Sequence, residues 1–312
     1  MFSTLSNLEK AMKSPRIFRG LTGISINDFE NLIPTFSQVV REFLIERRND
    51  KSTKERALWG GRKGLLVSCR EQLFFILAYV RLYLTLEMMG FFWNGTSKWR
   101  AHDWVMKYLP LLQKTLGREI VLPKRRIGSI EEFIKTYPDL KEFFLDGSER
   151  RVQRPKKDKI QKKNYSGKKK THTVKNGIIA TKDKRILFVS KTHEGKKHDS
   201  PIVDDMEVRK LRDFFWYGDS AFVAFKNILT PKKATKLHPL TKEDKEMNRE
   251  ISRIRVKIEH TFSYSGWKRF WVVRNTLRNR IYGDFQTVKM DIKDMFAMIS
   301  AGLHNLSLRN SA

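Results

Sequence analysis

The sequence lacks cysteine pairs, long apolar runs and a balance of charge, and each absence excludes a class of protein. Its single cysteine, Cys69, rules out an internal disulfide framework, and the Cys and His spacing of a zinc site is missing as well. The best candidate for a membrane span, Leu73 to Val80, stops at Arg81 and is far too short. No secretory signal is visible at the N-terminus. These absences predict an intracellular protein in a reduced compartment.

Acidic residues are scarce beside basic ones. The chain has 63 Lys and Arg against 34 Asp and Glu, a formal net charge of +29, and the excess is spread through the sequence. Such a charge favours a polyanionic partner; a membrane surface is the alternative, which the lack of long apolar stretches weakens. With 312 residues, 40% of them hydrophobic, the chain can build two cores but has little room for a third.

The first 125 residues carry helical patterns. Ile26 to Phe43 is amphipathic, and the charged segment Glu46 to Arg62 is typical of a linker. A buried helix is expected over residues 71–86 and a short one over 85–91. A turn at Asn94-Gly95 then leads into a longer helix.

That longer helix is expected to begin after the N-cap Ser97, to contain Pro110 and to be closed by Gly117. Its apolar face would be Ala101, Val105, Tyr108, Leu109, Leu112 and Leu116, and its mainly basic outer face Arg100, Asp103, Lys107 and Lys114. This outline, over about residues 71–117, is that of a helix-turn-helix whose second helix reads a DNA major groove. An ordinary helical hairpin with a solvated charged face fits the pattern about equally well.

Strand-like runs begin after Pro123. They lie at residues 142–146, 170–180, 185–190 and 213–218, with a hairpin turn at 181–184 and a helix at 200–211 that has Pro201 at its first position. The first and fourth runs are apolar without alternation, as central strands covered on both faces would be. This order is the one that a ribonuclease-H-like α/β domain requires.

Three acids occupy positions that suit metal-dependent phosphodiester chemistry. Asp146 and Asp219 each close an apolar run, at the expected C-terminal end of a central strand. If those strands are adjacent and parallel, both carboxylates enter one crevice at the sheet edge. Two divalent ions about 4 Å apart, held by such carboxylates, can activate a nucleophile and stabilise the leaving oxygen.

Glu259 is the third acid. On a helix from about Ile251 to Phe262 it lies about 80° from the centre of the apolar stripe, so it can point along the sheet toward the metals. Arg255, one turn earlier, falls on the same side and could orient Glu259 or hold a phosphate. A surface pair of Arg255 and Glu259 is the alternative, and only the three acids together outweigh it.

Two clusters of basic residues are further candidates for contact with DNA. The run from Lys156 to Lys170 has eight Lys against one Asp and could hold a DNA backbone, with a solvated mobile loop as the alternative. Residues 267–274 interleave aromatics with cations; buried helix packing is favoured for these aromatics over stacking on bases.

Four blocks of sequence carry a family likeness. They are Leu145-Asp146-Gly147-Ser148-Glu149-Arg150, Tyr165 to His172, Tyr217-Gly218-Asp219, and Arg255 to Phe262. Together they resemble bacterial insertion-sequence transposases of the IS5 group, over roughly residues 70–300, and the ordered set is far more specific than any single block. Two positions differ from the related signature, with Ser252 and Gly266 in place of Tyr and Lys.

The resemblance implies a helix-turn-helix-containing, all-helical N-terminal domain at 1–125 and a ribonuclease-H-like mixed-sheet catalytic domain at 126–312. It implies a DDE triad of Asp146, Asp219 and Glu259 that binds two Mg²⁺ ions, with Mn²⁺ as a substitute. The expected DNA contacts are Arg100, Lys107, Lys114, Arg150, Arg151, Lys168, Lys169, Lys170, Arg255 and Lys268.

The activity that the resemblance implies is binding of terminal inverted repeats, metal-dependent strand cleavage, and strand transfer to target DNA. The expected partner is double-stranded DNA and no membrane, with a homodimer or larger assembly on DNA, in a bacterial cytoplasm at the nucleoid. A ribonuclease-H-like nuclease without strand transfer, and a DNA-binding protein that has lost catalysis, are the alternatives.

Overall fold

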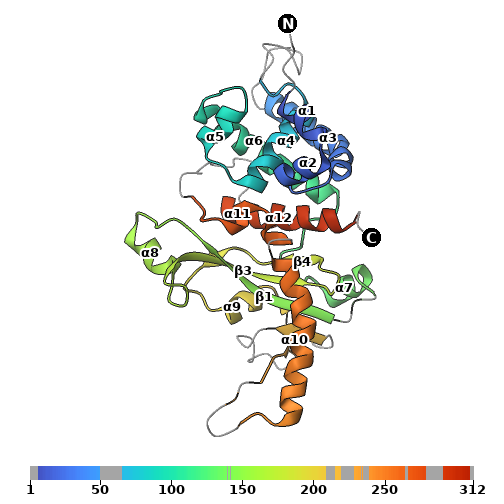
Figure 1. Cartoon of the computed structure of the whole chain (residues 1–312), viewed down its shortest axis with the longest axis vertical. Helices are drawn as coiled ribbons and strands as arrows, with labels where there is room; N and C mark the ends of the chain where they lie inside the picture. The colour runs from blue at the N-terminus through green and yellow to red at the C-terminus, as the bar shows by residue number, and fades with distance from the viewer. Residues whose placement is uncertain are drawn as a thin grey trace. The chain divides into compact units, whose positions relative to one another are not determined.

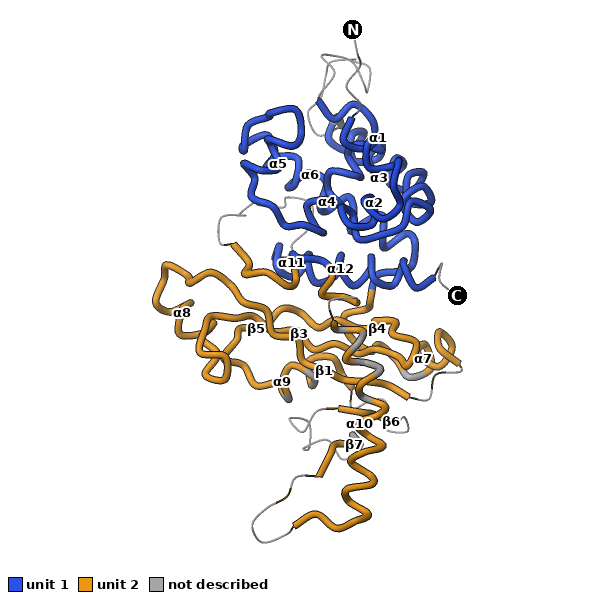
Figure 2. The backbone as a smooth tube through the Cα atoms, in the orientation of Figure 1, with its two compact units in different colours: residues 1–122, 270–272, 281–312 blue, residues 123–269, 273–280 orange. Residues whose placement is uncertain are grey.

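The computed structural model describes residues 6–49, 65–138, 140, 142–208, 215–218, 228–232, 234, 239–263, 266–278 and 291–309. The chain divides into two compact units (Figure 2). Unit 1 comprises residues 1–122, 270–272 and 281–312, and unit 2 comprises residues 123–269 and 273–280. Within the described ranges, no helix is long and apolar enough to cross a membrane.

Unit 1 is helical throughout its described part (Figure 1). Its helices are α1 (Asn7–Met12), α2 (Pro15–Thr22), α3 (Ile26–Asn49), α4 (Cys69–Leu82), α5 (Leu86–Phe92), α6 (Lys98–Arg118) and α12 (Ile292–Arg309). The helix starts are fixed by hydroxyl caps: the side chains of Ser68, Thr85 and Ser97 each accept a hydrogen bond from a backbone N–H of the first turn. The capping role predicted for Ser97 is confirmed.

Helix α4 is shorter than the sequence predicted. It ends at Leu82 rather than near residue 86 because Tyr83 takes the left-handed conformation (φ 46°) and its N–H bonds to the Tyr79 carbonyl. The predicted linker is also partly wrong, because α3 continues through its first residues to Asn49; the rest of that segment, from residue 50 through Arg62, lies outside the described residues.

Helix α6 confirms the predicted apolar face and corrects the predicted end. All of its expected core residues are buried: Ala101, Val105, Tyr108, Leu109, Leu112 and Leu116. The helix continues through Pro110 and past Gly117 to Arg118. Helix α12 packs against α6, and Asn305 donates from Nδ2 to the Val121 carbonyl at 2.9 Å. The C-terminal helix therefore completes the core of unit 1.

Unit 2 is built on a mixed sheet. In its described residues the strand order is β2-β3-β1-β6-β7, and β4 and β5 also pair with β3. The strands are β1 (Glu142–Arg151), β2 (Tyr165–Ser166), β3 (Thr171–Ala180), β4 (Ile186–Val189), β5 (His193–Glu194), β6 (Phe215–Gly218) and β7 (Ile228–Leu229). Strand β1 is antiparallel to β3 and parallel to β6. The predicted mixed α/β class of this part of the chain is confirmed.

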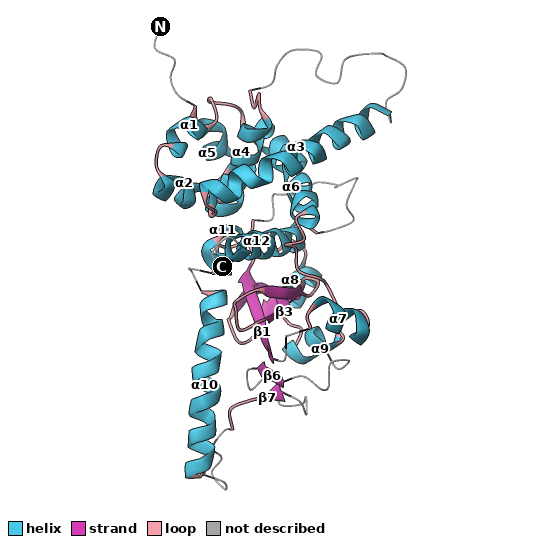
Figure 3. Ribbon diagram, turned by 90° about the vertical axis from the view of Figure 1, so that its right-hand side faces the viewer, coloured by secondary structure: helices cyan, strands magenta, loops and turns pink. Residues whose placement is uncertain are grey.

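Helices lie on both sides of this sheet: α10 runs on one side, and α7 and α9 lie on the other (Figure 3). The helical segments of this part of the chain are α7 (Ile130–Thr136), α8 (Asp158–Asn164), α9 (Asp199–Asp204), α10 (Lys242–Phe262) and the short 3-10 helix η3 (Trp267–Arg269). Helix α11 (Trp271–Arg274) is divided between the two units. Between the sheet and the α7 and α9 side, Phe143 packs on Trp216 with ring centroids 5.0 Å apart. Both side chains are fully buried, as expected for central strands.

The hairpin between β3 and β4 is the one the sequence predicted, since Thr181 donates its N–H to the Arg185 carbonyl and Lys184 donates to Thr181. Two other predictions are wrong. Helix α9 ends at Asp204, far short of residue 211, and Pro201 is its third residue rather than its first. The basic run Lys156 to Lys170 contains helix α8, strand β2 and a turn at residues 167–170, whereas the sequence pattern predicts a loop; its predicted contact with DNA stays a prediction.

Candidate functional site

Asp146 directly follows the last residue of β1 for which parallel pairing is described. The register pairs Phe144 with Tyr217 and Leu145 with Gly218, the last described residue of β6. Strand β1 itself continues to Arg151 because residues beyond Asp146 go on pairing with β3. The expectation that Asp146 closes its strand is therefore wrong, although the adjacent parallel arrangement of β1 and β6 is confirmed.

The side of the sheet that Asp146 faces follows from strand alternation. A Cβ on the next residue, Gly147, would lie 3.5 Å from the Asp199 carboxylate at the start of α9, so Gly147 faces the α9 side. Successive side chains of a strand point to opposite faces. The half-buried Asp146 therefore projects to the other side of the sheet, along which α10 runs (Figure 3).

Glu259 is carried by α10, three residues before that helix ends. The helix begins after Thr241, whose hydroxyl accepts from the Asp244 N–H, and it contacts β6. Of the predicted apolar stripe Ile251 is buried and Ile254 half-buried, while the side chains of Ile258 and Phe262 lie outside the described residues. Glu259 itself is exposed. The predicted position of Glu259 at the edge of the packed face stays a prediction.

An aromatic stack lies beside Asp146. Phe144 and Tyr217 are paired across β1 and β6 with ring centroids 5.1 Å apart and an interplanar angle of 18°. Burial raises the pKa of Tyr217, and Glu142 adds to the shift. The Tyr217 hydroxyl therefore stays protonated near neutral pH and adds no negative charge near the acids.

Two of the three predicted metal ligands, Asp146 and Glu259, lie among the described residues. Asp219 follows Gly218 in the sequence but lies outside the described residues. Among the residues that are described, no three His, Cys, Asp or Glu side chains form a group that could hold a metal ion. Asp146 and Glu259 supply carboxylate oxygens, the ligands that Mg²⁺ and Mn²⁺ prefer. The donor set thus fits a hard divalent cation.

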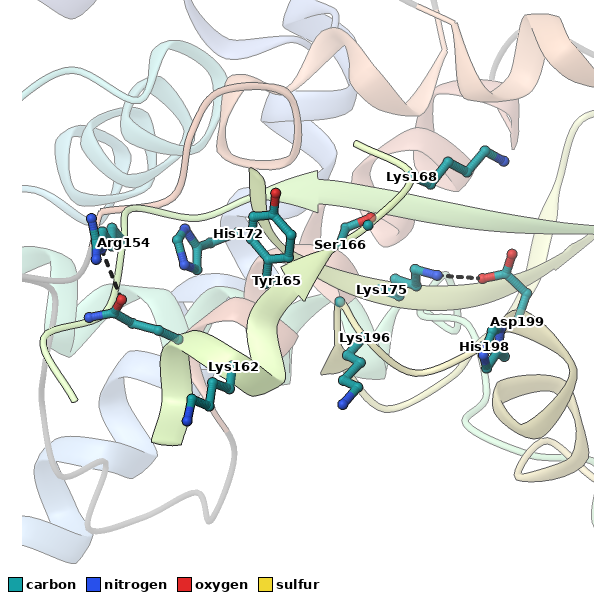
Figure 4. Close-up of a pocket in the computed structure, with 13 residues that line it drawn as sticks. Arg154, Lys162, Tyr165, Ser166, Lys168, His172, Lys175, Lys196, His198 and Asp199 are labelled. Atoms are coloured by element: carbon teal, nitrogen blue, oxygen red, sulfur yellow. Dashed lines mark hydrogen bonds and ion pairs between the residues drawn. The ribbon is translucent and has the colours of Figure 1, made fainter. Parts of the chain in front are cut away.

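Two basic clefts lie among the described residues of unit 2. The larger, the Tyr165 cleft, has a volume of about 940 Å³ and lies between α8–β2, β3 and the β5–α9 loop (Figure 4). The smaller, the Arg151 cleft, has a volume of about 510 Å³ and is lined by Glu149, Arg150, Arg151, Lys169, Thr173, Lys268, Val273, Arg274, Asn275 and Thr276. Predicted DNA contacts from three separate segments thus meet in the Arg151 cleft. Sequence reasoning missed Arg274 as a member, although it ended the noted basic and aromatic cluster.

Not every predicted DNA contact remains suited to that role. Arg150 is only 2% exposed, and its Nη2 donates to Asn176 Oδ1 at 2.7 Å. Its neighbour Arg151 is exposed, as are Lys168, Lys169 and Lys170, and Lys268 is half-buried. The side chain of Arg255 lies outside the described residues. The prediction for Arg150 is corrected, because a guanidinium used in this way supports the sheet.

The predicted basic face of α6 is largely taken up by α3. Lys114 Nζ lies 3.3 Å from Glu42, and Lys107 lies over the rings of Phe43 and Tyr108. Burial lowers the pKa of Lys107, and Arg47 lowers it further. Arg100 is exposed. The helix-turn-helix prediction is thus not confirmed, since two of its three basic residues make contacts within unit 1.

The comparison with known proteins agrees with the mixed α/β fold of unit 2. Residues 145–305 match the family described as DDE superfamily endonuclease, and the chain belongs to that family. Endonucleases of this superfamily generally depend on divalent metal ions. The chain is also 26% identical over 278 residues, covering 88% of this chain and 91% of the relative, to a probable transposase for insertion sequence element IS702 from Microchaete diplosiphon. No solved structure matches it.

Proposed function

We propose that this chain is an insertion-sequence transposase whose acids Asp146, Asp219 and Glu259 direct metal-dependent cleavage and strand transfer of DNA. Its membership of the DDE endonucleases and its similarity to a probable transposase support the general activity. The four sequence blocks that resemble the IS5 group support placing it there. Binding of terminal inverted repeats completes the proposal.

The observation that carries the proposal is the register between β1 and β6. Leu145 is paired with Gly218 in parallel strands, and each is followed in the sequence by one of the proposed acids. The residue after each member of a parallel pair continues toward the same sheet edge, where ligands of α/β sheets bind. This register supports a shared site for Asp146 and Asp219.

Glu259 supports the same site from a different element. Asp146 projects to the side of the sheet along which α10 runs, and α10 contacts the strand that precedes Asp219. Acids carried by or following two parallel neighbouring strands and by a covering helix can converge on one site. A pair of bound divalent ions would supply Lewis-acid activation and stabilise the leaving oxygen. The chain's part is to hold those carboxylates in place and to position the DNA.

The Arg151 cleft is a further proposed surface for DNA, away from the acids. Strand β1 leads from Asp146 directly to Arg151, and Leu277 bonds to β1 there: its N–H donates to the Arg151 carbonyl at 2.9 Å. This pairing holds Arg274 beside Arg151 and Lys169 in one cleft. Phosphate contacts from Arg and Lys give affinity that falls steeply with salt. We propose that this cleft binds a stretch of DNA backbone on the face of the sheet opposite to Asp146.

Strand transfer separates a transposase from a nuclease. The test uses purified protein, a labelled duplex with the element's own terminal repeat already cut to a 3′-hydroxyl, a supercoiled target plasmid and Mg²⁺. Joined product is expected, and Glu259→Gln abolishes it while the α10 control Glu250→Gln keeps it. Cleavage of uncut repeats without any joining of the pre-cut end would support a nuclease instead. Binding with neither reaction would support a protein that has lost catalysis.

A further inference from the structure

The Tyr165 cleft has a built frame that the acid site does not explain. Asp199, one of its lining residues, lies on the Gly147 side of the sheet, opposite to Asp146. The frame is tied by main-chain hydrogen bonds: Gly195 donates to the Thr173 carbonyl and Lys196 donates to the Lys163 carbonyl, both at 3.0 Å. Three segments of chain are therefore fixed against one another around the cleft.

Gly195 is required for this frame. A Cβ at that position would lie 2.7 Å from the Asn164 carbonyl oxygen and 2.7 Å from the Thr173 carbonyl oxygen. Any larger residue would push the β5–α9 loop away from α8 and β3. The ion pair of Lys163 with Glu194, at 3.0 Å, adds a second tie at the same place. The cleft is thus preorganised.

An aromatic side chain stands open inside the cleft. Tyr165 is 43% exposed, although it is held by its cross-strand pairing with His172 in β2 and β3. The two rings make an edge contact with centroids 5.7 Å apart, which fixes the Tyr165 ring and leaves it accessible. Figure 4 shows both rings between Arg154 on one side and Lys168 on the other. An exposed, fixed aromatic is what a stacking platform needs.

The charge of the cleft is basic and largely uncompensated. Lysines 162, 168 and 196 line it and are exposed. Its acid Asp199 is paired with Lys175 at 3.1 Å, and none of the three lysines is paired with a carboxylate among the residues the structure describes. Cations around an exposed aromatic ring suit a nucleic-acid strand better than an isolated phosphate, because only the strand has bases that can stack on the ring.

We propose that the Tyr165 cleft binds an unpaired segment of single-stranded DNA, with one base stacked on Tyr165 and the flanking phosphates held by Lys162, Lys168 and Lys196. The proposal rests on the proposed function for the identity of the polymer as DNA. A duplex keeps its bases stacked on one another, so it can use the lysines but not the ring. The cleft therefore serves a strand that is frayed or displaced while the ends are processed.

The test measures fluorescence anisotropy of the full chain with labelled oligothymidine, and with the same backbone carrying abasic sites. Wild-type protein is expected to prefer the oligothymidine. Tyr165→Ala lowers that affinity by about 5- to 150-fold and abolishes the preference. Tyr165→Phe, which keeps the ring, keeps both. If Tyr165→Ala fails to fold by circular dichroism, Tyr165→Leu, which keeps apolar volume without a π face, replaces it.

The lysines are tested by salt dependence. Lys162→Ala and Lys168→Ala each reduce the slope of log affinity against log salt by about 0.7 for single strands. Lys159→Ala is the matched control, because Lys159 lies on α8 with Lys162, is exposed and does not line the cleft. This control variant is expected to reduce the slope by less than the two cleft variants.

Equal affinities of wild-type and Tyr165→Ala protein for oligothymidine, or an equal loss for the abasic strand, would overturn the proposal. So would equal slopes for the cleft lysine variants and Lys159→Ala. If wild-type protein shows no preference for oligothymidine but still carries out strand transfer, the stacking proposal fails and the transposase function stands. If wild-type protein prefers oligothymidine but carries out no strand transfer, the transposase function fails and the binding proposal for the cleft stands.

Discussion

Replacing the buried Arg150 provides a sharp test of its assignment to the core of unit 2. Its Nη2 donates to Asn176 Oδ1 at 2.7 Å and to Thr192 Oγ1 at 3.4 Å. Asn176 is fully buried and donates in turn to the Ser190 carbonyl at 3.0 Å. The network therefore links β1 to β3 and to the segment after β4. Arg150→Ala removes the charged member and leaves the Asn176 oxygen without this donor.

The size of the effect follows from these contacts. A hydrogen bond to a charged group contributes about 1.5–3 kcal/mol, and a buried acceptor left unsatisfied costs about 1–3 kcal/mol. We expect a loss of about 3 kcal/mol in the free energy of unfolding of unit 2. Each kcal/mol shifts the melting midpoint by about 2–4 °C for a unit of this size, so the midpoint should fall by about 6–12 °C.

The matched control is the next residue along the strand. Arg151 points to the opposite face, is exposed and lines the Arg151 cleft. Arg151→Ala should leave the melting midpoint within about 2 °C, since exposed substitutions usually change stability by less than about 0.5 kcal/mol. It should weaken DNA binding instead. A thermal melt and a DNA-binding titration of both variants check this; an Arg150→Ala protein as stable as wild type but unable to bind DNA would refute the reasoning.

Two further predictions concern stability. Gly195→Ala forces a Cβ to within 2.7 Å of the Asn164 carbonyl and should destabilise unit 2 by about 1–3 kcal/mol in chemical denaturation, whereas Gly167→Ala, with no heavy atom within 4 Å of its Cβ, should not. Arg118, by hydrogen bonding, lowers the pKa of Glu42, so this stabilisation is present above the ordinary pKa of 4.5 and is lost as pH falls below it. Glu42→Gln should flatten the acid limb of the unit 1 stability profile; an unchanged limb would show that the pair contributes nothing.

Local patterns predicted helices α4, α5 and α6 of unit 1 because each carries its own signals, whereas α1 and α2 were not predicted. Ser97 is followed by a regular apolar face, and the structure buries every member of that face. What failed depended on partners far away in the sequence. The basic face of α6 contacts α3 through Glu42 and Phe43, and no pattern within α6 could reveal a helix some 60 residues earlier. Gly117 did not end α6 because a helix tolerates glycine when the following residues keep bonding.

In unit 2 the sequence predicted which strands exist better than how far they run. The apolar run of β1 ends at Leu145, but the strand continues because β3 supplies hydrogen bonds to the polar residues that follow. The same pairing placed Arg150 inside the sheet, a position that its run of charged neighbours hid. Helix α8 was missed because its lysines carry no apolar periodicity and it is held by contacts to β3 and the β5–α9 loop. The triad residues stay a prediction, which the register of β1 and β6 supports.

The central claim is that Asp146 belongs to a metal-dependent DNA-cleaving site, and cleavage of a labelled terminal-repeat duplex tests it most directly. Wild-type protein is compared with Asp146→Asn and with Asp183→Asn, whose exposed aspartate lies in the β3–β4 turn, each with Mg²⁺ and with EDTA. The account predicts Mg²⁺-dependent cleavage at the element end by wild-type and Asp183→Asn protein, and at least a thousandfold loss, about 4 kcal/mol, in Asp146→Asn. Cleavage by Asp146→Asn at the wild-type rate, or cleavage that persists in EDTA, would contradict it.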